Sequence, residues 1–252
     1  MPELIIPNYR LVEKTIKSLF NLLFPETRLF SDDEIETNSQ KLQDDLSFVL
    51  SGLTVNSEEI AQELFKDIGA IKEVLIKDAD YMYESDPAAT GQIEIMALYP
   101  GFFAIFCYRI AHYLINFNIP LLPRMITEYA HKHTGIDIHP AAEIGNPIAI
   151  DHGTGIVIGG TAIIGNYVKI YQGVTLGALS VDKSKASTKR HPTIEDNVIL
   201  YAGCTILGGK TVIGNNSVIG GNVWLTKSIA PFSTVYHKSE IIMRNANDST
   251  NE

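Results

Sequence analysis

An apolar residue recurs at every sixth position in the second half of the chain, and this spacing limits the possible folds more than any other feature. The first series comprises Ile138, Ile144, Ile150, Ile156, Ala162, Val168 and Val174. The second series comprises Ile194, Leu200, Ile206, Val212, Val218 and Trp224. A period of six fits a coil of triangular cross-section, in which each side is one short strand and one tight turn. Hexapeptide repeats are a recognised signature of parallel β-helices.

Glycine follows the apolar residue at many of the expected turns, as at Gly145, Gly165 and Gly214. Glycine adopts tight-turn conformations at little cost, so this placement agrees with the coil. The competing interpretation is a sandwich of unrelated strands, which would show spacings of 8–12 residues with variable turns. The regular period of six favours the β-helix.

The first half of the chain has a helical pattern instead. Apolar residues follow i, i+3, i+4 and i+7 spacing in ETNSQKLQDDLSFVLSGL and in SEEIAQELFKDIGAIKEVLIKDADYMYESDPA. Ser57 resembles a helix N-cap with an acidic first turn, and Asp86-Pro87 predicts a break, because a residue before proline disfavours helix. We therefore expect an α+β chain with these parts: an N-terminal α-helical domain at 1–134, a C-terminal β-helix at 135–232 with an inserted loop at 178–191, and a tail at 233–252.

Composition excludes several classes of protein. The net charge of −9 argues against general nucleic-acid binding. No run of about eighteen apolar residues predicts a membrane span, and the first residues do not resemble a signal peptide. Two cysteines form no disulfide framework. We expect a cytoplasmic protein without nucleic-acid or membrane partners.

One turn of the coil, DHGTGIVIGG at 151–160, carries more polar chemistry than the repeat requires. An isolated histidine in such a turn is most often satisfied by backbone groups. The interruption ALSVDKSKASTKR at 178–190 is polar and basic, and a loop this long inside a repeat is usually functional or disordered. These two features together favour a binding or catalytic site on the coil.

Several separated motifs resemble the left-handed β-helix acyltransferases, and serine O-acetyltransferases in particular. The motifs on the coil are DIHPAAEIG (137–145), DHGTGIVIGGTAIIG (151–165), YQGVTLGALS (171–180), KRHPTIEDNV (189–198) and YAGCTILGG (201–209). The likeness continues through SDPA (85–88) and YPGFFAIFCYRIAHYL (99–114) and covers roughly residues 80–230. It implies a left-handed coil and transfer of an acetyl group from acetyl-CoA to L-serine, giving O-acetyl-L-serine and CoA.

The resemblance makes His152 the general base, since the pKa of histidine lies near operating pH. It gives Asp137 the task of orienting the imidazole. These residues are 15 positions apart, so a coil of about 18 residues per turn would bring them close on neighbouring coils. The resemblance implies direct attack without an acyl-enzyme, and we interpret Cys204 as an inert core thiol.

Four further residues match the acceptor site of the family. The resemblance implies that Asp86 and Asp151 hold the amino group of serine. His191 would help to bind the substrate, and Arg190 would offer a fork-shaped donor to its carboxylate. Three of them have an ordinary alternative interpretation: a turn residue before proline for Asp86, and a solvated charge for Asp151 and Arg190.

The resemblance also implies a groove for the pantetheine arm of coenzyme A, where small residues let it approach the backbone. The matching positions are Gly177, Ala178, Ala202, Gly203 and Gly221. Most glycines of such a coil are simply turn formers. Backbone amides in this groove would also stabilise the oxyanion of the tetrahedral intermediate.

Members of the family form trimers, often paired into hexamers through their helical domains, so the resemblance implies a homotrimer and possibly a hexamer. Three departures from the family pattern are visible. Gly160 replaces a glutamate, FSTVYHKSEIIMRN lacks a Gly-x-Pro-Ala stretch, and the chain ends in NDSTNE, without the isoleucine that inserts into cysteine synthase. The last departure makes a complex with cysteine synthase doubtful.

Three other functions stay open. One is acetyl transfer to another hydroxylated acceptor, such as homoserine or a sugar. Another is a zinc-dependent carbonic anhydrase, which needs three histidine ligands, for which the coil offers His139, His152 and His191 without a close pair. The third is a non-catalytic scaffold, which leaves the Asp-His turn unexplained. We expect no metal.

Overall fold

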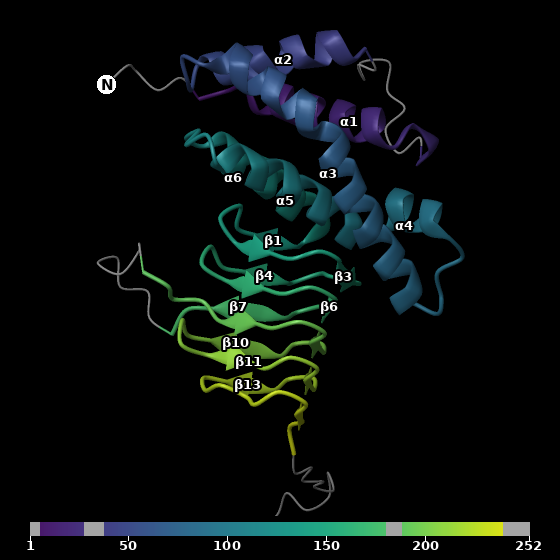
Figure 1. The fold of residues 1–252 in the computed structure, drawn as a ribbon, viewed down its shortest axis with the longest axis vertical. Helices are drawn as coiled ribbons and strands as arrows, with labels where there is room; N and C mark the ends of the chain where they lie inside the picture. The colour runs from purple at the N-terminus through teal and green to yellow at the C-terminus, as the bar shows by residue number, and fades with distance from the viewer. Residues whose placement is uncertain (1–5, 28–37, 180–187, 239–252) are drawn as a thin grey trace, which may run out of the picture.

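The structure is a computed structural model that describes residues 6–27, 38–179 and 188–238. Helices at one end of the molecule sit above a stack of short strands (Figure 1). The helices are α1 (Tyr9–Leu23), η1 (Pro25–Thr27), α2 (Ser39–Ser51), α3 (Ser57–Ser85), α4 (Gln92–Leu98), α5 (Pro100–Ile115) and α6 (Leu122–Thr134). The strands are β1 (Asp137–Ile138), β2 (Glu143–Ile144), β3 (Ile148–Asp151), β4 (Val157–Ile158), β5 (Ile163–Ile164), β6 (Val168–Tyr171), β7 (Thr175–Gly177), β8 (Thr193–Ile194), β9 (Ile199–Leu200), β10 (Thr205–Leu207), β11 (Val212–Ile213), β12 (Val218–Ile219), β13 (Trp224–Leu225) and β14 (Thr234–Val235).

The strands form three parallel sheets, one for each side of the coil. Their orders are β1-β4-β7-β10-β13, β2-β5-β8-β11 and β3-β6-β9-β12-β14. Apolar side chains stack inside the coil: Ile158 pairs with Leu176, which pairs with Ile206, and all three are almost fully buried. The predicted parallel β-helix is thus confirmed.

The coils differ in length. Asp137 pairs with Val157, twenty residues on, whereas Val157 pairs with Thr175, eighteen residues on. Thr175 pairs with Thr205, because the inserted loop lengthens that coil. The expected 18 residues per turn therefore holds for one coil, and the first coil is two residues longer.

The helical domain is built around α5, which is buried along most of its length. Phe20 of α1 and Phe24, which follows the end of that helix, pack edge-on against Phe102 of α5. α3 ends at Ser85, where the Asp86-Pro87 pair predicted a break. Within the described ranges no single helix is long and apolar enough to cross a membrane; α4 and α5 pass that length and composition test only as a pair bent by 73°.

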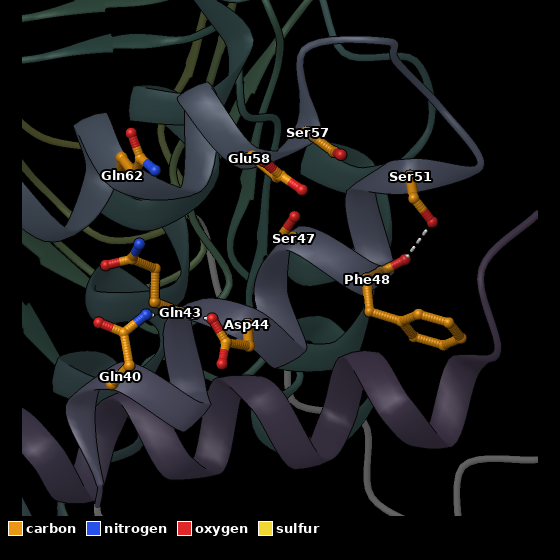
Figure 2. Close-up of a pocket in the computed structure, with 9 residues that line it drawn as sticks. All are labelled: Gln40, Gln43, Asp44, Ser47, Phe48, Ser51, Ser57, Glu58 and Gln62. Carbon is orange, nitrogen blue, oxygen red and sulfur yellow. Dashed lines mark hydrogen bonds between the residues drawn. The ribbon is translucent and has the colours of Figure 1, made fainter.

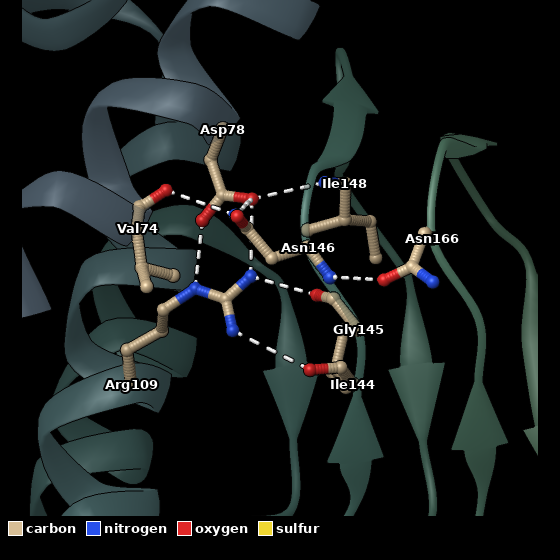
Figure 3. Close-up of polar contacts among 8 residues, drawn as sticks. All are labelled: Val74, Asp78, Arg109, Ile144, Gly145, Asn146, Ile148 and Asn166. Carbon is tan, nitrogen blue, oxygen red and sulfur yellow. Dashed lines mark hydrogen bonds and ion pairs between the residues drawn. The ribbon is translucent and has the colours of Figure 1, made fainter.

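A buried carboxylate fastens the helices to the first coil (Figure 3). Asp78 of α3 accepts hydrogen bonds from Arg109 Nε (2.7 Å), Arg109 Nη2 (3.0 Å), Asn146 Nδ2 (2.9 Å) and the Ile148 backbone N–H (2.9 Å). Arg109 also donates to the carbonyl of Gly145 at 2.9 Å. Because a buried charge is tolerated only when well paired, this network fixes α3 and α5 against the coil.

The last helix and the last strand of the coil have defined ends. α6 ends at Thr134, and Gly135 caps it in the left-handed region with φ 71°. Strand β14 pairs with β12 and extends the coil to Val235, three residues past the expected end at 232. Residues 180–187 of the inserted loop and the tail from 239 onward lie outside the described residues.

Candidate active site

A histidine projects from the coil at the corner between β3 and β4. We call this corner, residues 151–155, the base edge. His152, Gly153 and Gly155 all have positive φ, of 57°, 89° and 83°. At Gly153 the positive φ by itself disfavours a side chain, because L residues rarely adopt that conformation. These conformations account for the two extra residues of the first coil, and they leave the His152 side chain 73% exposed.

Asp151 joins this histidine to a lysine. Its Oδ1 lies 3.8 Å from His152 Nε2, and its Oδ2 lies 3.4 Å from Lys169 Nζ. The same Nζ donates to the carbonyl of Ser85, the last residue of α3, at 2.6 Å. The end of α3 is therefore held beside the base edge.

Asp86 lies at this contact. Its Oδ2 accepts a hydrogen bond from the Tyr99 hydroxyl at 2.6 Å, and its Oδ1 accepts one from the Ala88 N–H at 2.9 Å. The bond from Tyr99, with smaller effects of the charges on Lys169 and His152, holds the pKa of Asp86 below its usual value. The structure thus gathers Asp86, Asp151 and His152, residues from two domains, in one place.

Asp137 has a different partner from the expected one. Its Oδ1 accepts from Arg124 Nη1 at 3.0 Å, and Arg124 also pairs with Glu128. In the described part of the chain, no hydrogen bond or ion pair joins Asp137 to His152. The orienting role of Asp137 stays a prediction.

His191 lies at the corner between β7 and β8, residues 178–192, which we call the loop edge. Its Nδ1 accepts from the Thr161 N–H (3.0 Å) and lies 2.8 Å from Thr161 Oγ1. Burial, together with the charges of Arg190 and Lys189, lowers the pKa of His191 to about 4. At neutral pH the imidazole is therefore uncharged, and since Nδ1 accepts, its proton is on Nε2.

The neighbours of His191 reinforce this placement. A Cβ on Gly159 would lie 2.1 Å from His191 Cδ2, so the ring packs directly on the glycine backbone. Thr161 Oγ1 accepts from the backbone N–H groups of Arg190 (2.9 Å) and His191 (3.1 Å). Lys189 Nζ donates to the Thr161 carbonyl at 2.7 Å, so this ammonium group stabilises the end of the inserted loop against the coil.

Gly160 stands beside His139. A Cβ at this position would lie 2.7 Å from His139 Nδ1, which accepts from the Ala141 N–H at 3.1 Å. Burial, with the charge of Arg124, lowers the pKa of His139. A side chain at position 160 would therefore collide with the His139 ring.

The small residues expected to line the coenzyme groove fall on both edges. Ala202, Gly203 and Gly221 lie below His152, where the Ala202 carbonyl would be 3.2 Å from a Cβ on Gly221. Gly203 has φ 71°, which by itself explains a glycine at that turn. Gly177 ends β7, so it and Ala178 lie at the loop edge.

The two edges are separated within one chain. Strand β4 runs between them, from the turn at Gly155 to Gly159 beneath His191. Four residues of extended backbone span about 13 Å. His152 and His191 therefore do not face one common site on a single chain, and neither do the two halves of the expected coenzyme groove.

Cys204 is fully buried in the coil, and burial raises the pKa of its thiol to about 12. A thiol in that state is a poor nucleophile, because the thiolate is the reactive form. The interpretation of Cys204 as a core residue agrees with this environment, and an acyl-cysteine route does not.

Two other features of the described residues lie apart from the base edge. The helices α2 and α3 enclose a hollow of about 540 Å³ (Figure 2), lined by Gln40, Gln43, Asp44, Ser47, Phe48, Ser51, Ser57, Glu58 and Gln62. Glu128, His131 and Asp137 have the spacing of metal ligands, but Arg124 already binds both carboxylates.

The three histidines considered for a zinc site do not come together in one chain. His152 lies on the base edge, whereas His139 and His191 lie on the opposite edge.

Sequence reasoning missed Lys169, Tyr99, Thr161 and Arg124. Lys169 offered one signal, since it is a lysine between Val168 and Ile170 in a coil strand. Its burial comes from α3, which the local pattern does not show. Thr161 and Tyr99 look ordinary in sequence, because their importance lies in contacts with residues 30 and 13 positions away.

This parallel coil of hexapeptide repeats, with a histidine at one corner and an inserted loop at another, defines a left-handed β-helix acyltransferase. No family model matches the chain. It is 50% identical over 182 residues to a serine acetyltransferase of Synechococcus elongatus, and 41% identical over 172 residues to one of Staphylococcus xylosus. The chain belongs to the serine acetyltransferase family.

Solved structures agree with this assignment. Serine acetyltransferase 1 of Entamoeba histolytica, in complex with L-cysteine, matches with a TM-score of 0.78 at 36% identity, over 89% of this chain and 86% of that one. The Neisseria gonorrhoeae enzyme in complex with serine matches at 0.65 and 29%, over 87% and 95%. The sequence alignment with the Synechococcus relative covers 70% of this chain but only 57% of that relative. The alignment with the Staphylococcus relative covers 68% of this chain and 76% of that relative.

Proposed function

We propose that this protein transfers the acetyl group of acetyl-CoA to the hydroxyl of L-serine, giving O-acetyl-L-serine and CoA for cysteine biosynthesis. The observation that carries the proposal is the meeting of Asp86, Asp151 and His152 at the contact between α3 and the base edge. Two carboxylates beside a histidine suit an acceptor that has both an ammonium group and a hydroxyl. A bare scaffold requires none of them.

The separation of the edges supports a trimer. If the base edge of one chain packs against the loop edge of the next, His152 meets His191 and Arg190 of the neighbour. The same packing completes the coenzyme groove, since Ala202, Gly203 and Gly221 would face Gly177 and Ala178. The exposure of His152 in the single chain fits such an arrangement. Pairing of trimers through the helical domains would give a hexamer.

In the proposed reaction His152 removes the proton of the serine hydroxyl as the oxygen attacks the thioester carbonyl. Asp151 and Asp86 hold the ammonium group, and the Nε2–H of His191 with the guanidinium of Arg190 receives the carboxylate. Asp137 orients and stabilises the imidazolium, as an orienting carboxylate does elsewhere. The positive φ at His152 directs its side chain away from the coil, toward the substrate.

The intermediate then breaks down with loss of CoA. Backbone N–H groups of the groove stabilise the oxyanion, and protonated His152 returns its proton to the departing thiolate. No group of the enzyme is acylated in this route. The buried thiol of Cys204 is consistent with that.

Thiol release from acetyl-CoA tests the proposal directly. We expect release by the purified protein to depend on L-serine, with L-homoserine, D-serine and a galactoside as comparison acceptors. Variant His152→Asn should lose the activity, and the exposed His237→Asn serves as its control. Release that depends on another acceptor and not on L-serine would overturn the substrate assignment but leave acetyl transfer in place.

The partners follow from the same proposal. L-serine and acetyl-CoA are the substrates, and the cytoplasm is the compartment where acetyl-CoA and reduced cysteines are expected. L-cysteine differs from L-serine only in its sulfur, so it should compete for the same carboxylates.

A further inference from the structure

We infer that Lys169 is a positioning residue that holds Asp86 and Asp151 at the separation needed for the ammonium group of the acceptor. The inference rests on the proposed transfer to L-serine and goes beyond it, because it adds a residue to the acceptor site. Lys169 touches neither the reacting oxygen nor the thioester in this scheme. It acts through the two carboxylates.

The first observation is where Lys169 lies. It is on β6, between the core residues Val168 and Ile170, so its side chain leaves the coil on the outer face. An outward lysine on a coil is ordinarily solvated, yet only 8% of this residue is exposed. Burial of a lysine is rare unless the ammonium is paired, so its contacts have to account for it.

The second observation is that its three contacts come from both domains. Nζ donates to the Ser85 carbonyl (2.6 Å), lies 3.4 Å from Asp151 Oδ2, and lies 4.7 Å from the centroid of the Tyr171 ring. Burial lowers the pKa of Lys169, but the interactions with Tyr171 and Asp151 outweigh burial and raise it overall. The ammonium is therefore charged at neutral pH.

The third observation links Lys169 to Asp86. Ser85 ends α3, and the last carbonyls of a helix lack partners within it and carry the negative end of its dipole. A cation there fixes the helix end, and the next residue is Asp86. The ammonium group of Lys169 thus fixes the backbone that precedes Asp86, and it also fixes the side chain of Asp151.

The contact has a kinetic consequence. Both carboxylates hold the ammonium group in the ground state and in the transition state alike. Loosening them should raise KM for L-serine and leave kcat nearly unchanged. KM for acetyl-CoA should change less, because the contacts described for Lys169 are with Ser85, Asp151 and Tyr171 and not with the small residues proposed for the coenzyme groove.

Variant Lys169→Met tests the inference, since methionine keeps most of the apolar stem and removes the charge. We expect KM for L-serine to rise about tenfold, the effect of losing a hydrogen bond to a charged group, with kcat within about twofold. Variant Lys169→Arg should restore most of the affinity. Lys66→Met, on the exposed face of the same helix α3, is the matched control.

Hydrogen exchange without any acceptor gives a second readout that does not depend on the proposed function. In Lys169→Met the amides of Ala88 and Ala89, which donate to Asp86 Oδ1 and to the Asp86 carbonyl, should exchange faster. Unchanged exchange with an unchanged or lower KM for L-serine would overturn the inference. So would a fall in kcat and thermal stability at constant KM. A wild-type protein inactive with L-serine would refute the proposed function, and the exchange result would still decide whether Lys169 holds Asp86.

Discussion

His152 and His191 lie on opposite edges of the same sheet, and their surroundings differ in almost every respect. The base edge leaves His152 73% exposed on a turn with positive φ, close to carboxylates. The loop edge buries His191 to 8% exposure against Gly159, with Nδ1 bound to Thr161 and cations nearby. One histidine is exposed at a corner of the coil, and the other is fixed in one neutral tautomer.

This difference shows how one repeat can supply two kinds of histidine. A general base has to take up and release a proton near neutral pH, which an exposed imidazole can do. A substrate-binding donor is more useful when its proton stays on one nitrogen, which burial and Thr161 ensure for His191. In the proposed reaction each edge supplies a different part of the site. Variants of His152 and of His191 therefore test the two edges separately.

The largest effect is expected from His152→Asn. Asparagine tolerates positive φ, so the turn should survive. Loss of the base should lower kcat about a thousandfold, while the midpoint of thermal unfolding should change little because the side chain is exposed. Activity within tenfold of the wild type would show that another group is the base; His237→Asn should behave like the wild type in both measurements.

The pH dependence of stability should reveal the buried histidine. The folded-state pKa of His191, about 4, lies below the unfolded value of about 6.5. The unfolded state therefore binds the proton first as pH falls, so the stabilisation present above pH 6.5 is lost between pH 6.5 and 4. The loss attributable to His191 is about 3 kcal/mol.

Urea unfolding at several pH values in this range measures the effect. His191→Gln should lose about 3 kcal/mol less than the wild type over the range, because glutamine does not titrate. His139 remains in both proteins, so its own lowered pKa largely cancels in the difference. Parallel curves for the two proteins would contradict the burial of a neutral His191.

The fold was predictable because the hexapeptide period is a local pattern that repeats along the coil. The interior positions Ile158, Leu176 and Ile206 follow directly from it. The end of the helical domain was also predictable, from the change of period near residue 134. The inserted loop at 178–191 appeared as an interruption of the same pattern.

The details of the site were less predictable, since they depend on contacts between distant segments. The hydrogen bond from Arg124 to Asp137 could not be predicted from the period of the coil, because Arg124 lies on helix α6. The burial of Lys169 depends on how α3 packs. The motifs indicated which corners of the coil carry polar side chains, but the partners that those side chains have there required the structure.

A smaller effect is expected from Gly159→Ala, which should damage the loop edge alone. The new Cβ would lie 2.1 Å from His191 Cδ2, so the ring has to move. Such overpacking costs about 2 kcal/mol of stability, and KM for L-serine should rise while KM for the thioester changes less. Gly69→Ala, which meets nothing within 4 Å inside α3, should instead stabilise the protein slightly. Equal behaviour of the two variants would show that His191 is not held by Gly159.

The smallest effect is expected from Arg124→Met, which acts on the base edge through Asp137. The pair is partly exposed, with side chains 38% and 23% accessible, so stability should change by less than about 0.5 kcal/mol. Without the guanidinium on Oδ1, the carboxylate is free to rotate, and an imidazole that depends on it is oriented less well. We expect kcat to fall about threefold with KM for L-serine unchanged, whereas Asp137→Asn should lower kcat by more than tenfold. Arg10→Met, an exposed arginine on α1, is the control for removing a positive charge. If Arg124→Met leaves kcat unchanged while Asp137→Asn lowers it, Asp137 reaches the base without help from α6; if neither variant changes kcat, the base edge works through Asp151 alone.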